Sequence, residues 1–493
     1  MALAPLQPTD SARRAVLVLA QAVKAKGGRA LLVGGCVRDM LLAVKPKDFD
    51  VEVYGITPVN LEEIVKSLGE ASDIGKAFAV LKLHVDDTDI DISIPRTDSK
   101  VAPGHTGFAV HADPSMSYAE AARRRDFTVN AIMLDPLTGE IVDPFRGADD
   151  LQAKVLRVVD PALFADDPLR VLRGLQFAAR FNLQVDEASK EIMRRAVPQL
   201  AELPRERVGA EWRKLLLLAE RPSIGLELGH ELGVYHQLHP ELPPLAVTPQ
   251  EPAWHPEGNV WIHTLMVVDV AARIIRREKL ESHQALVVML AGLCHDFGKA
   301  VTTTVEDGRI RSKGHEEAGR ALTEHFLDAL AVDLETKQRV VSLVVHHLTP
   351  SMFYHLETNV GQHVSDGAIR ALARRLHPAT IVELAHLSEC DFCGMGPFPD
   401  PEDPSKKSFR TFDPYGTWLL GRALVIDAAS HRPLDLLRGQ ELLEMGFTPG
   451  PGIGELITIA NRLRDERGAT RDDIIRLLSS SAGNIEIAKQ RLQ

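Results

Sequence analysis

The sequence predicts an α+β fold in which a small mixed sheet with helices is followed by a mostly helical remainder. An amphipathic helix is expected from Ser11 to Lys26, and helical apolar spacing dominates from about residue 151 onward, as in ERVGAEWRKLLLLAE. Strand patterns are confined to the first part of the chain, at 30–34, 49–54, 79–85, 89–94 and 131–134.

Two proline-rich breaks divide the helical part of the chain. The first is HPELPPLAVTPQEPAWHP at 239–256, and the second is GPFPDPEDPSKKS at 396–408. Because such segments neither continue a helix nor pair in a sheet, they mark domain boundaries. We therefore expect four domains, at 1–150, 151–245, 246–400 and 401–493.

Length and composition place the chain among multidomain proteins without a disulfide framework. It has 493 residues, more than one core usually contains, and only four cysteines. No apolar run reaches the roughly 18 residues that a membrane span needs, and the N-terminus lacks the pattern of a signal peptide, so we expect a cytoplasmic protein with no membrane contact.

The formal net charge of −11 restricts how the chain can bind nucleic acid. Phosphate groups require Lys and Arg at the point of contact, so any binding surface must be local. Basic clusters suited to this role occur at 123–125, 170–180, 194–195 and 205–214.

A glycine pair ends the first strand pattern in LLVGGCVRDMLLAVKPKDFDV. Gly34 and Gly35 predict a tight turn from a strand into a helix. The free backbone N–H groups at the start of that helix, together with Arg38, can bind a triphosphate.

Two aspartates follow the glycine turn in the strand pattern DFDVEV. Asp48 and Asp50 are one residue apart, so they are expected on one face of that strand. Two such carboxylates can bind a pair of Mg²⁺ ions, which would activate an attacking hydroxyl and neutralise a leaving pyrophosphate. Asp91, in a neighbouring strand pattern, is either a third carboxylate near the metal or a surface acid.

The order GG-x-x-R-D, D-x-D and then RRDFTVNA resembles the bacterial-type (class II) CCA-adding tRNA nucleotidyltransferases and their poly(A) polymerase relatives. The resemblance implies a polymerase-β-like nucleotidyltransferase head in the first domain. It also implies that Arg125 contacts the phosphates, and that Asp126 and Asn130 sense the ribose of the incoming nucleotide.

A further block, FADDPLRVLRGLQFAARF, predicts a helix that starts near Pro168 with Asp167 at its N-cap and presents Arg170 and Arg173 one turn apart. Taken alone, this is an N-cap with two exposed arginines. The family resemblance implies instead that Asp167 and Arg170 act as a protein template that pairs with the edges of C or A. Asp166 stands where the family motif usually has Glu.

Two more segments match the family by position. The resemblance implies that Glu206, Arg207 and Glu211 brace the template helix. It also implies that 98–118, with GHTGF as its core, is a flexible loop that helps to switch between nucleotides.

The third domain holds most of the histidines, since 15 of the 19 lie between His230 and His386. Five blocks follow one another along the chain: WIHTLMVV, GLCHDFGKA, SKGHEEAG, VVHHLTP and SECDFCG. Together they resemble the HD metal-dependent phosphohydrolases, an all-α superfamily. The expected metal ligands are His263, His295, Asp296 and Asp391, with His315 and His346 as further candidates. A mixed nitrogen and oxygen set favours Ni²⁺, Mn²⁺ or Co²⁺, whereas the carboxylates of the first domain suit Mg²⁺.

These observations favour an enzyme that uses CTP and ATP to add C, C and A to the 3′ end of tRNA, with an additional phosphatase or 2′,3′-cyclic phosphodiesterase domain. No stable protein partner is implied. The alternatives are a poly(A) polymerase, a protein uridylyltransferase with an HD reversing domain, or a non-catalytic RNA-binding module. GKAFAVLKL in place of a basic GRRF-like stretch argues against the first. RRDFTVNA and DDPLR argue against the second, and the retained ligands of both metal sites against the third.

Overall fold

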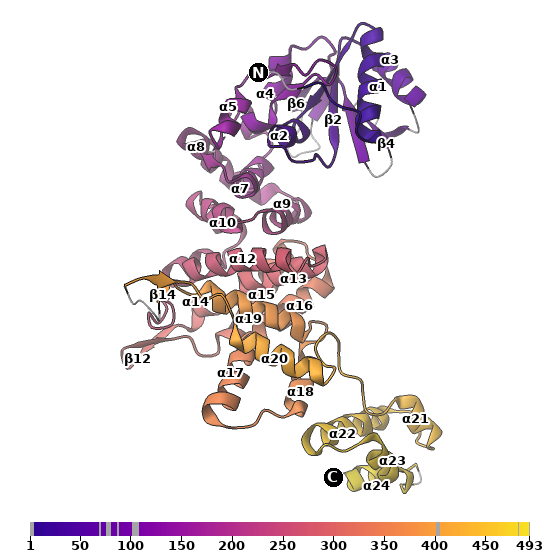
Figure 1. The fold of residues 1–493 in the computed structure, drawn as a ribbon, viewed down its shortest axis with the longest axis vertical. Coiled ribbons are helices and arrows are strands. Elements are labelled where there is room, and N and C mark those ends of the chain that lie inside the picture. The colour runs from indigo at the N-terminus through magenta and orange to yellow at the C-terminus, as the bar shows by residue number, and fades with distance from the viewer. Residues whose placement is uncertain are drawn as a thin grey trace. The chain divides into compact units, whose positions relative to one another are not determined.

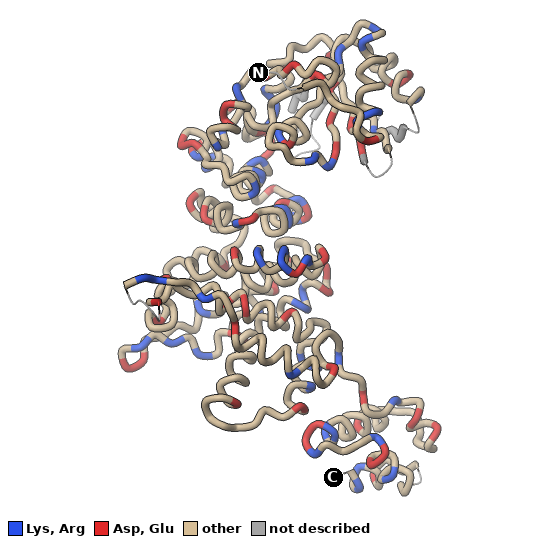
Figure 2. Tube along the Cα trace, in the orientation of Figure 1, with Lys and Arg blue, Asp and Glu red and all other residues tan. Residues whose placement is uncertain are grey.

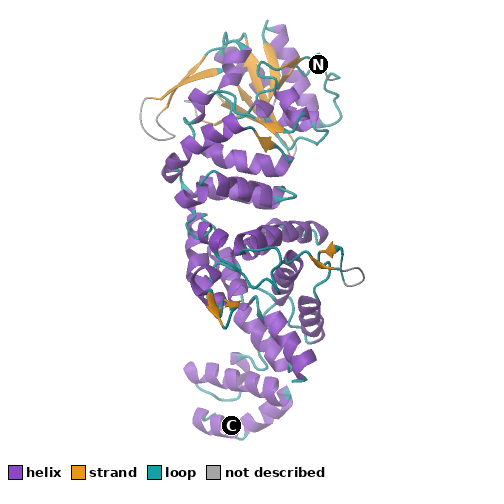
Figure 3. Ribbon diagram, turned by 90° about the vertical axis from the view of Figure 1, so that its left-hand side faces the viewer, coloured by secondary structure: helices purple, strands orange, loops and turns teal. Residues whose placement is uncertain are grey.

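The computed structural model describes residues 4–68, 71–74, 80–85, 88–100, 108–400, 405–481 and 483–492 (Figure 1). The chain folds into two compact units. Unit 1 comprises Met1–Glu211 and Ile224–Leu238, and unit 2 comprises Trp212–Ser223 and His239–Gln493. The main sheet belongs to unit 1, and unit 2 is mostly helical (Figure 3). The four domains expected from the sequence are a finer division, which stays a prediction.

The main sheet of unit 1 has the strand order β3-β4-β5-β2-β1-β8-β9. Its strands are β1 (Arg29–Val33), β2 (Phe49–Tyr54), β3 (Ala71–Ile74), β4 (Val80–Val85), β5 (Thr88–Ser93), β8 (Met133–Leu134) and β9 (Ile141–Val142). β2 pairs with β5 in parallel and with β1 in antiparallel orientation, so the sheet is mixed, as predicted. A separate hairpin is formed by β6 (Arg96–Lys100) and β7 (Phe108–Ala112).

Alternating side chains of the central strands pack on the two faces of the sheet. Leu32 and Val51 contribute to the core beneath α1 (Ser11–Ala25) and α3 (Pro58–Leu68). Leu31 contributes to the opposite face, which α4 (Tyr118–Arg123) covers. Every second residue of β2 therefore points toward α4.

Further helices lie between and after the strands of the main sheet along the chain, and two of them include residues of unit 2. They are α2 (Gly35–Leu41), α5 (Gly147–Gln152), α6 (Pro161–Phe164), α7 (Leu169–Phe181), α8 (Glu187–Ala196), α9 (Arg205–Leu218), α10 (Pro222–Glu231) and α11 (Val234–Leu238). A short parallel pair, β10 (Val155–Leu156) with β11 (Gln184–Val185), lies among them. The predicted change from sheet to helix near residue 151 is confirmed.

Unit 2 is built on a helical core. Its larger helices are α12 (Val260–Arg277), α13 (Ser282–Cys294), α15 (His315–Ala329), α16 (Leu334–His346), α18 (Asp366–Leu376), α19 (Ile381–Gly394) and α20 (Pro414–Val425). Between them lie α14 (Lys299–Thr302), α17 (Thr349–His355), the hairpin β12 (Thr304–Glu306) and β13 (Arg309–Arg311), and the pair β14 (Phe398–Pro399) and β15 (Lys407–Ser408).

One helical segment of this core is long enough and apolar enough on average to cross a membrane, although His295, Asp296 and Lys299 interrupt its apolar run. Ser282–Thr302 has a mean hydropathy of 1.4, and 78% of that window is buried inside the protein. The apolar character follows from its position, because α13 packs against α12, α16 and α19.

The chain ends in a small bundle of α21 (Gly439–Glu444), α22 (Pro451–Arg467), α23 (Arg471–Ser479) and α24 (Ile485–Leu492), which has its own apolar core. Asp465 of α22 fastens this bundle to α18. Its buried carboxylate pairs with Arg374, lies 3.8 Å from Arg370 Nη1 and accepts from Arg464 Nε at 3.0 Å.

Two candidate active sites

The first candidate site is a cavity of about 380 Å³ on the α4 side of the main sheet. Three carboxylates and three guanidinium groups line it, and they belong to Asp50, Glu52, Asp91, Arg96, Arg124 and Arg125. Asp50 and Glu52 share one face of β2, and Asp50 is in register with Asp91 across the parallel β2 and β5 pair. This register favours the first of the two alternatives for Asp91, a third carboxylate near the metal, which stays a prediction.

Asp48 differs from its expected position. β2 begins at Phe49, so the expectation that both aspartates lie on this strand is wrong for Asp48, which is an exposed residue just before the strand. Its charge still contributes to raising the pKa of Asp50. Glu52 joins Asp50 in the cavity. The sequence analysis did not identify it, although the period-two pattern of DFDVEV was a signal for it.

The predicted turn from strand to helix is confirmed at the glycine pair. Gly34 has a φ of 74° and is the N-cap of α2, whose first residue is Gly35. A Cβ atom at Gly34 would lie 2.9 Å from Arg125 Nη1 and 3.5 Å from Asp50 Oδ2. The backbone conformation therefore favours glycine, and a side chain here would also displace the end of Arg125.

Charges of both signs are concentrated around the cavity. The surrounding protein raises the pKa of Asp50 by desolvation, and Arg125 opposes this shift. Burial, together with the neighbouring Arg96 and Arg170, lowers the pKa of Arg124 to about 10. Elsewhere Lys and Arg alternate with Asp and Glu along the described chain (Figure 2). Hard carboxylate oxygens beside crowded guanidinium groups fit a complex of Mg²⁺ with a polyphosphate.

A chain of hydrogen bonds joins α2 to α7 behind this cavity. Arg38 Nη1 donates to Asn130 Oδ1 at 2.6 Å, Asn130 Nδ2 donates to Asp126 Oδ1 at 3.0 Å, and Arg173 Nε donates to Asp126 Oδ2 at 2.6 Å. Burial opposes the ionisation of Asp126, but Arg173 and Asn130 lower its pKa overall.

Arg38 is 4% exposed and also pairs with Asp39, so the structure does not bring it to the cavity as expected. Its guanidinium stacks on Phe181, with the central carbon 4.2 Å from the ring centroid. Arg38 therefore supports the buried network that holds Asp126 and Asn130 in place.

Helix α7 begins slightly later than predicted. α7 starts at Leu169 with Pro168 as its N-cap, although Asp167 Oδ1 does accept from the backbone N–H of Leu169 at 3.2 Å. Arg207 Nη2 of α9 donates to both carboxylate oxygens of Asp167, at 3.0 and 3.3 Å. The expectation that Arg207 braces this helix is thus consistent with the geometry.

Arg170 is held by backbone rather than by Asp167. Its guanidinium donates to the carbonyl oxygens of Leu163 at 2.8 Å and Arg124 at 2.6 Å. Glu211 is buried and helps to raise the pKa of Arg173, whereas Glu206 is exposed. Most of the loop core GHTGF, residues 104–107, lies outside the described residues.

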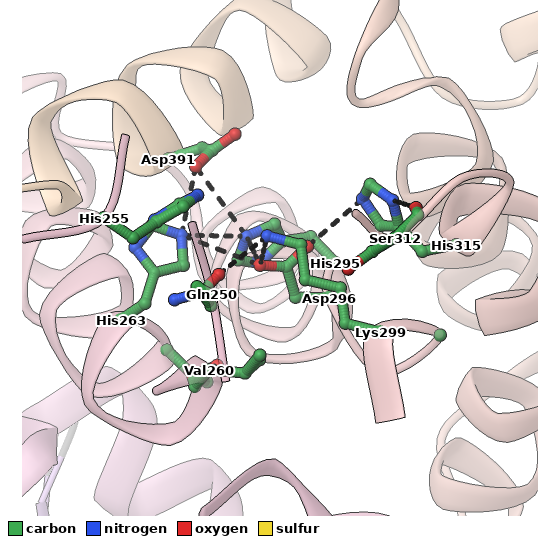
Figure 4. Close-up of polar contacts among 12 residues, drawn as sticks. Gln250, His255, Val260, His263, His295, Asp296, Lys299, Ser312, His315 and Asp391 are labelled. Carbon is green, nitrogen blue, oxygen red and sulfur yellow. Dashed lines mark hydrogen bonds and ion pairs between the residues drawn. The ribbon is translucent and has the colours of Figure 1, made fainter. Parts of the chain in front are cut away.

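The second candidate site is a cluster of histidines and carboxylates in unit 2 (Figure 4). It brings together His263 of α12, His295 and Asp296 after α13, and Asp391 of α19. His263 Nε2 lies 3.1 Å from Asp391 Oδ1 and 3.3 Å from His295 Nε2. His295 Nε2 lies 3.2 Å from Asp296 Oδ2. The four residues expected as metal ligands therefore meet at one place.

A second group of possible ligands shares Asp296. His315 Nε2 lies 3.3 Å from Asp296 Oδ1 and 3.1 Å from the Nε2 atom of His347. The two oxygens of Asp296 thus face two different groups of imidazoles, an arrangement with room for one cation on each side of this carboxylate.

The ring orientations suit metal binding. The Nδ1 atoms of His295, His315 and His347 lie 2.9, 2.7 and 2.6 Å from backbone carbonyl oxygens. Such bonds place the proton on Nδ1 and leave Nε2 as the metal-binding atom. Burial lowers the pKa of His347 to about 3, so its ring is neutral and its Nε2 lone pair is available.

Glu257 orients the ring of His263 from behind. Its Oε1 atom lies 3.0 Å from His263 Nδ1 and 2.8 Å from His255 Nδ1, and its Oε2 atom accepts from the backbone N–H of Gly396 at 3.0 Å. Burial opposes the charge, yet these bonds lower the pKa of Glu257 to about 2. Burial likewise opposes charge on His263, but Asp391 and Glu257 raise its pKa to about 9.

A lysine supplies positive charge at the same place. Lys299 Nζ lies 2.7 Å from Asp296 Oδ2 and donates to Gln250 Oε1 at 2.8 Å. The cluster therefore combines metal-binding groups with a cation that can contact a phosphate oxygen.

His346 requires a correction. His347, not His346, joins the cluster, because the two neighbouring residues at the end of α16 point in different directions. His346 lies near Arg320 and Arg375 instead. The sequence also did not identify His255, Glu257 and Lys299, although the block WHPEG just before α12 was a signal for the first two.

Comparison with known proteins agrees with both sites. The poly(A) polymerase head domain matches residues 30–157, the probable RNA- and SrmB-binding site of polymerase A matches 182–245, and the HD domain matches 260–385. Among solved structures, the Bacillus stearothermophilus CCA-adding enzyme in complex with CTP is similar in fold, with 19% identity and a TM-score of 0.62 over 93% of each chain.

Curated relatives match this chain over most of its length. The multifunctional CCA protein of Methylobacillus flagellatus is 38% identical over 65% of this chain and 74% of its own length. The protein of the same name from Xanthomonas euvesicatoria is 34% identical over 87% of this chain and 96% of its own. With this identity over nearly the full length of a relative, the chain belongs to the family of multifunctional CCA proteins, nucleotidyltransferases with a polymerase-type head and an HD domain.

Proposed function

We propose that unit 1 adds C, C and A to the 3′ end of tRNA from CTP and ATP, without a nucleic-acid template. The observation that carries the proposal is the register of Asp50 with Asp91 in a cavity lined by arginines. The names of the curated relatives and the CTP complex of the related structure support it.

In this reaction the terminal 3′ hydroxyl of tRNA attacks the α-phosphorus of the nucleotide, and the bond to pyrophosphate breaks. Asp48 and Asp50, with Asp91 and Glu52 close by, would hold Mg²⁺, which activates the hydroxyl and neutralises the leaving group. Arg125, with Arg124 and Arg96, would bind the triphosphate. The buried Asp126 and Asn130 would contact the ribose.

Selection of the base is assigned to Asp167 and Arg170 at the start of α7. A carboxylate beside a guanidinium can satisfy the exocyclic amine and the ring acceptor that C and A share, whereas U and G present a different pattern. The bidentate contact from Arg207 fixes the direction of the Asp167 carboxylate before the nucleotide arrives.

We further propose that the unit 2 cluster is a metal-dependent phosphohydrolase site acting on phosphomonoesters and 2′,3′-cyclic phosphates. His263, His295, Asp296 and Asp391 would hold one transition metal ion, and Asp296, His315 and His347 a second. Ni²⁺, Mn²⁺ and Co²⁺ suit this donor set. A water molecule would attack phosphorus, one ester bond would break, and the released ribose oxygen would take a proton.

The test uses purified protein, tRNA that lacks its 3′ CCA, and each labelled nucleotide in turn. Incorporation of CTP and then ATP, with UTP and GTP rejected, supports the first proposal. Extension by many A residues would support a poly(A) polymerase instead, and labelling of protein by UTP a uridylyltransferase. A cytoplasmic setting without a membrane or a stable protein partner is part of the same proposal.

A further inference from the structure

Three Phe or Trp side chains are exposed in the described part of the chain, and they belong to segments that are bonded or packed to residues around the unit 2 cluster. Trp254, Phe409 and Phe412 have exposed fractions of 65%, 55% and 62%. Trp254 directly precedes His255, and the two phenylalanines lie between β15 and α20. Exposed rings on segments that flank a cluster of metal-binding side chains are candidates for a binding surface, because large apolar side chains are otherwise mostly buried.

Hydrogen bonding and packing tie these rings to the ligand cluster. The backbone N–H of Gly396 donates to Glu257, the residue that orients His263. Gly396 has a φ of 120°, and a Cβ atom there would lie 3.3 Å from Phe398 and 3.4 Å from Phe409. The ring of Phe409 therefore packs on the same backbone segment that holds the metal-binding imidazole in position.

The segment that carries the phenylalanines is rigidly supported. The guanidinium carbon of Arg410 lies 4.2 Å from the ring centroid of Phe392, the neighbour of Asp391, and 4.1 Å from that of Phe398. Asp413, directly after Phe412, caps α20 and accepts from Ser388 Oγ of α19 at 2.7 Å. The rings are thus presented on a fixed support beside the cluster.

We propose that Trp254, Phe409 and Phe412 form a stacking surface for the base of the nucleotide or RNA 3′ end whose phosphate is hydrolysed at the cluster. The inference rests on the proposed hydrolase function of unit 2. Every base offers a π face, so such a surface accepts different bases, and Arg410 and Lys407 add positive charge suited to the RNA backbone. The Phe409 segment is connected to the metal-binding residues through Gly396 and Glu257, which favours a substrate base over a protein partner.

The decisive experiment compares a substrate with a base and one without. The full-length protein is assayed with Ni²⁺, Mn²⁺ or Co²⁺ on adenosine 2′,3′-cyclic phosphate and on β-glycerophosphate. For Trp254→Ala, Phe409→Ala and Phe412→Ala we expect kcat/KM for the cyclic nucleotide to fall by about tenfold each through a higher KM, with glycerophosphate unchanged. Phe409→Tyr should retain the wild-type ratio.

Val425→Ala is the matched control, because this side chain of α20 is 86% exposed and lies outside the three-ring surface. Equal loss on both substrates would show that the rings only support the fold and would overturn the inference. Unchanged kcat/KM for both substrates would also overturn it and would leave the rings as a protein-binding surface. If the unmodified protein hydrolyses neither substrate, the hydrolase proposal itself fails.

A binding measurement without metal gives a second, activity-independent readout. The chain has four tryptophans, and Trp212 and Trp261 are buried. The difference in fluorescence between the unmodified protein and Trp254→Phe isolates Trp254. Adenosine 2′,3′-cyclic phosphate should quench this difference signal, whereas β-glycerophosphate should not. Equal responses to both ligands would contradict stacking even if the hydrolase proposal holds.

Discussion

Replacing Arg207 with Ala tests whether base selection depends on a carboxylate that is oriented in advance. Arg207 Nη2 contacts both oxygens of Asp167, at 3.0 and 3.3 Å. Among the described residues, the backbone N–H of Leu169 is the other hydrogen-bond donor to this carboxylate. The two side chains are 31% and 37% exposed, so solvent screens the pair. We therefore assign about 1 kcal/mol to the contact, the upper range for exposed ion pairs.

If this contact orients Asp167 for base recognition, its loss should reduce discrimination for CTP against UTP. The expected reduction is about fivefold, because 1.4 kcal/mol corresponds to a factor of ten and the contact contributes about 1 kcal/mol. The assay is kcat/KM for each nucleotide on truncated tRNA. Asp167→Ala and the double variant complete a cycle, in which the Arg207 effect should vanish once Asp167 is absent.

Arg205→Ala is the control, since this exposed arginine also begins α9 and shares the charge of Arg207. A loss of rate in Arg207→Ala with unchanged selectivity would refute the reasoning. The same loss in the Arg205 variant would indicate a general contribution of positive charge to RNA binding.

Three further outcomes follow from the two sites and from one buried histidine. Asp48→Ala or Asp50→Ala should abolish incorporation of both CTP and ATP while tRNA binding, measured by filter retention, persists; normal incorporation would remove both from the metal site. His295→Ala or Asp296→Ala should eliminate metal-dependent hydrolysis and lower the bound transition metal measured by mass spectrometry, with nucleotide addition unchanged; loss of addition in a folded variant would show coupled units. Burial lowers the pKa of His239 to about 3, below its ordinary 6.5, so the unfolded chain binds the proton first and stability falls as pH drops below about 6.5. His239→Phe should therefore lose less stability than the unmodified protein between pH 7.5 and 5.5, by about 1.4 kcal/mol in urea denaturation, and parallel losses would disprove this role.

Local patterns predicted the elements that carry the head site. The strand that ends at the glycine pair depends only on neighbours in sequence, and so does the shared face of Asp50 and Glu52. The burial of Arg38 could not be predicted, because it depends on Asn130, 92 positions away in the chain. The motif that contains Arg38 is compatible with a guanidinium in a cavity and with one bonded to a buried amide, so the sequence alone could not distinguish the two positions.

The unit 2 cluster illustrates the same limit. Histidines in separate helical segments indicated a metal site, but neighbouring histidines on one helix differ in direction by about 100°. Spacing alone therefore could not choose His347 over His346, which required the position of α16 against His315. Glu257 was missed because its role arises from contact with His263 and not from a motif.

The attachment of the C-terminal bundle through Asp465 has a consequence for how this chain can evolve. The bundle has its own apolar core, and a single carboxylate between arginines of α18 and α22 makes much of its ionic connection to the rest of unit 2. Such a bundle can be lengthened, shortened or exchanged by recombination while the histidine cluster stays intact, provided that one acid remains to meet α18. Sequence changes can then accumulate in this bundle without disturbing either candidate site.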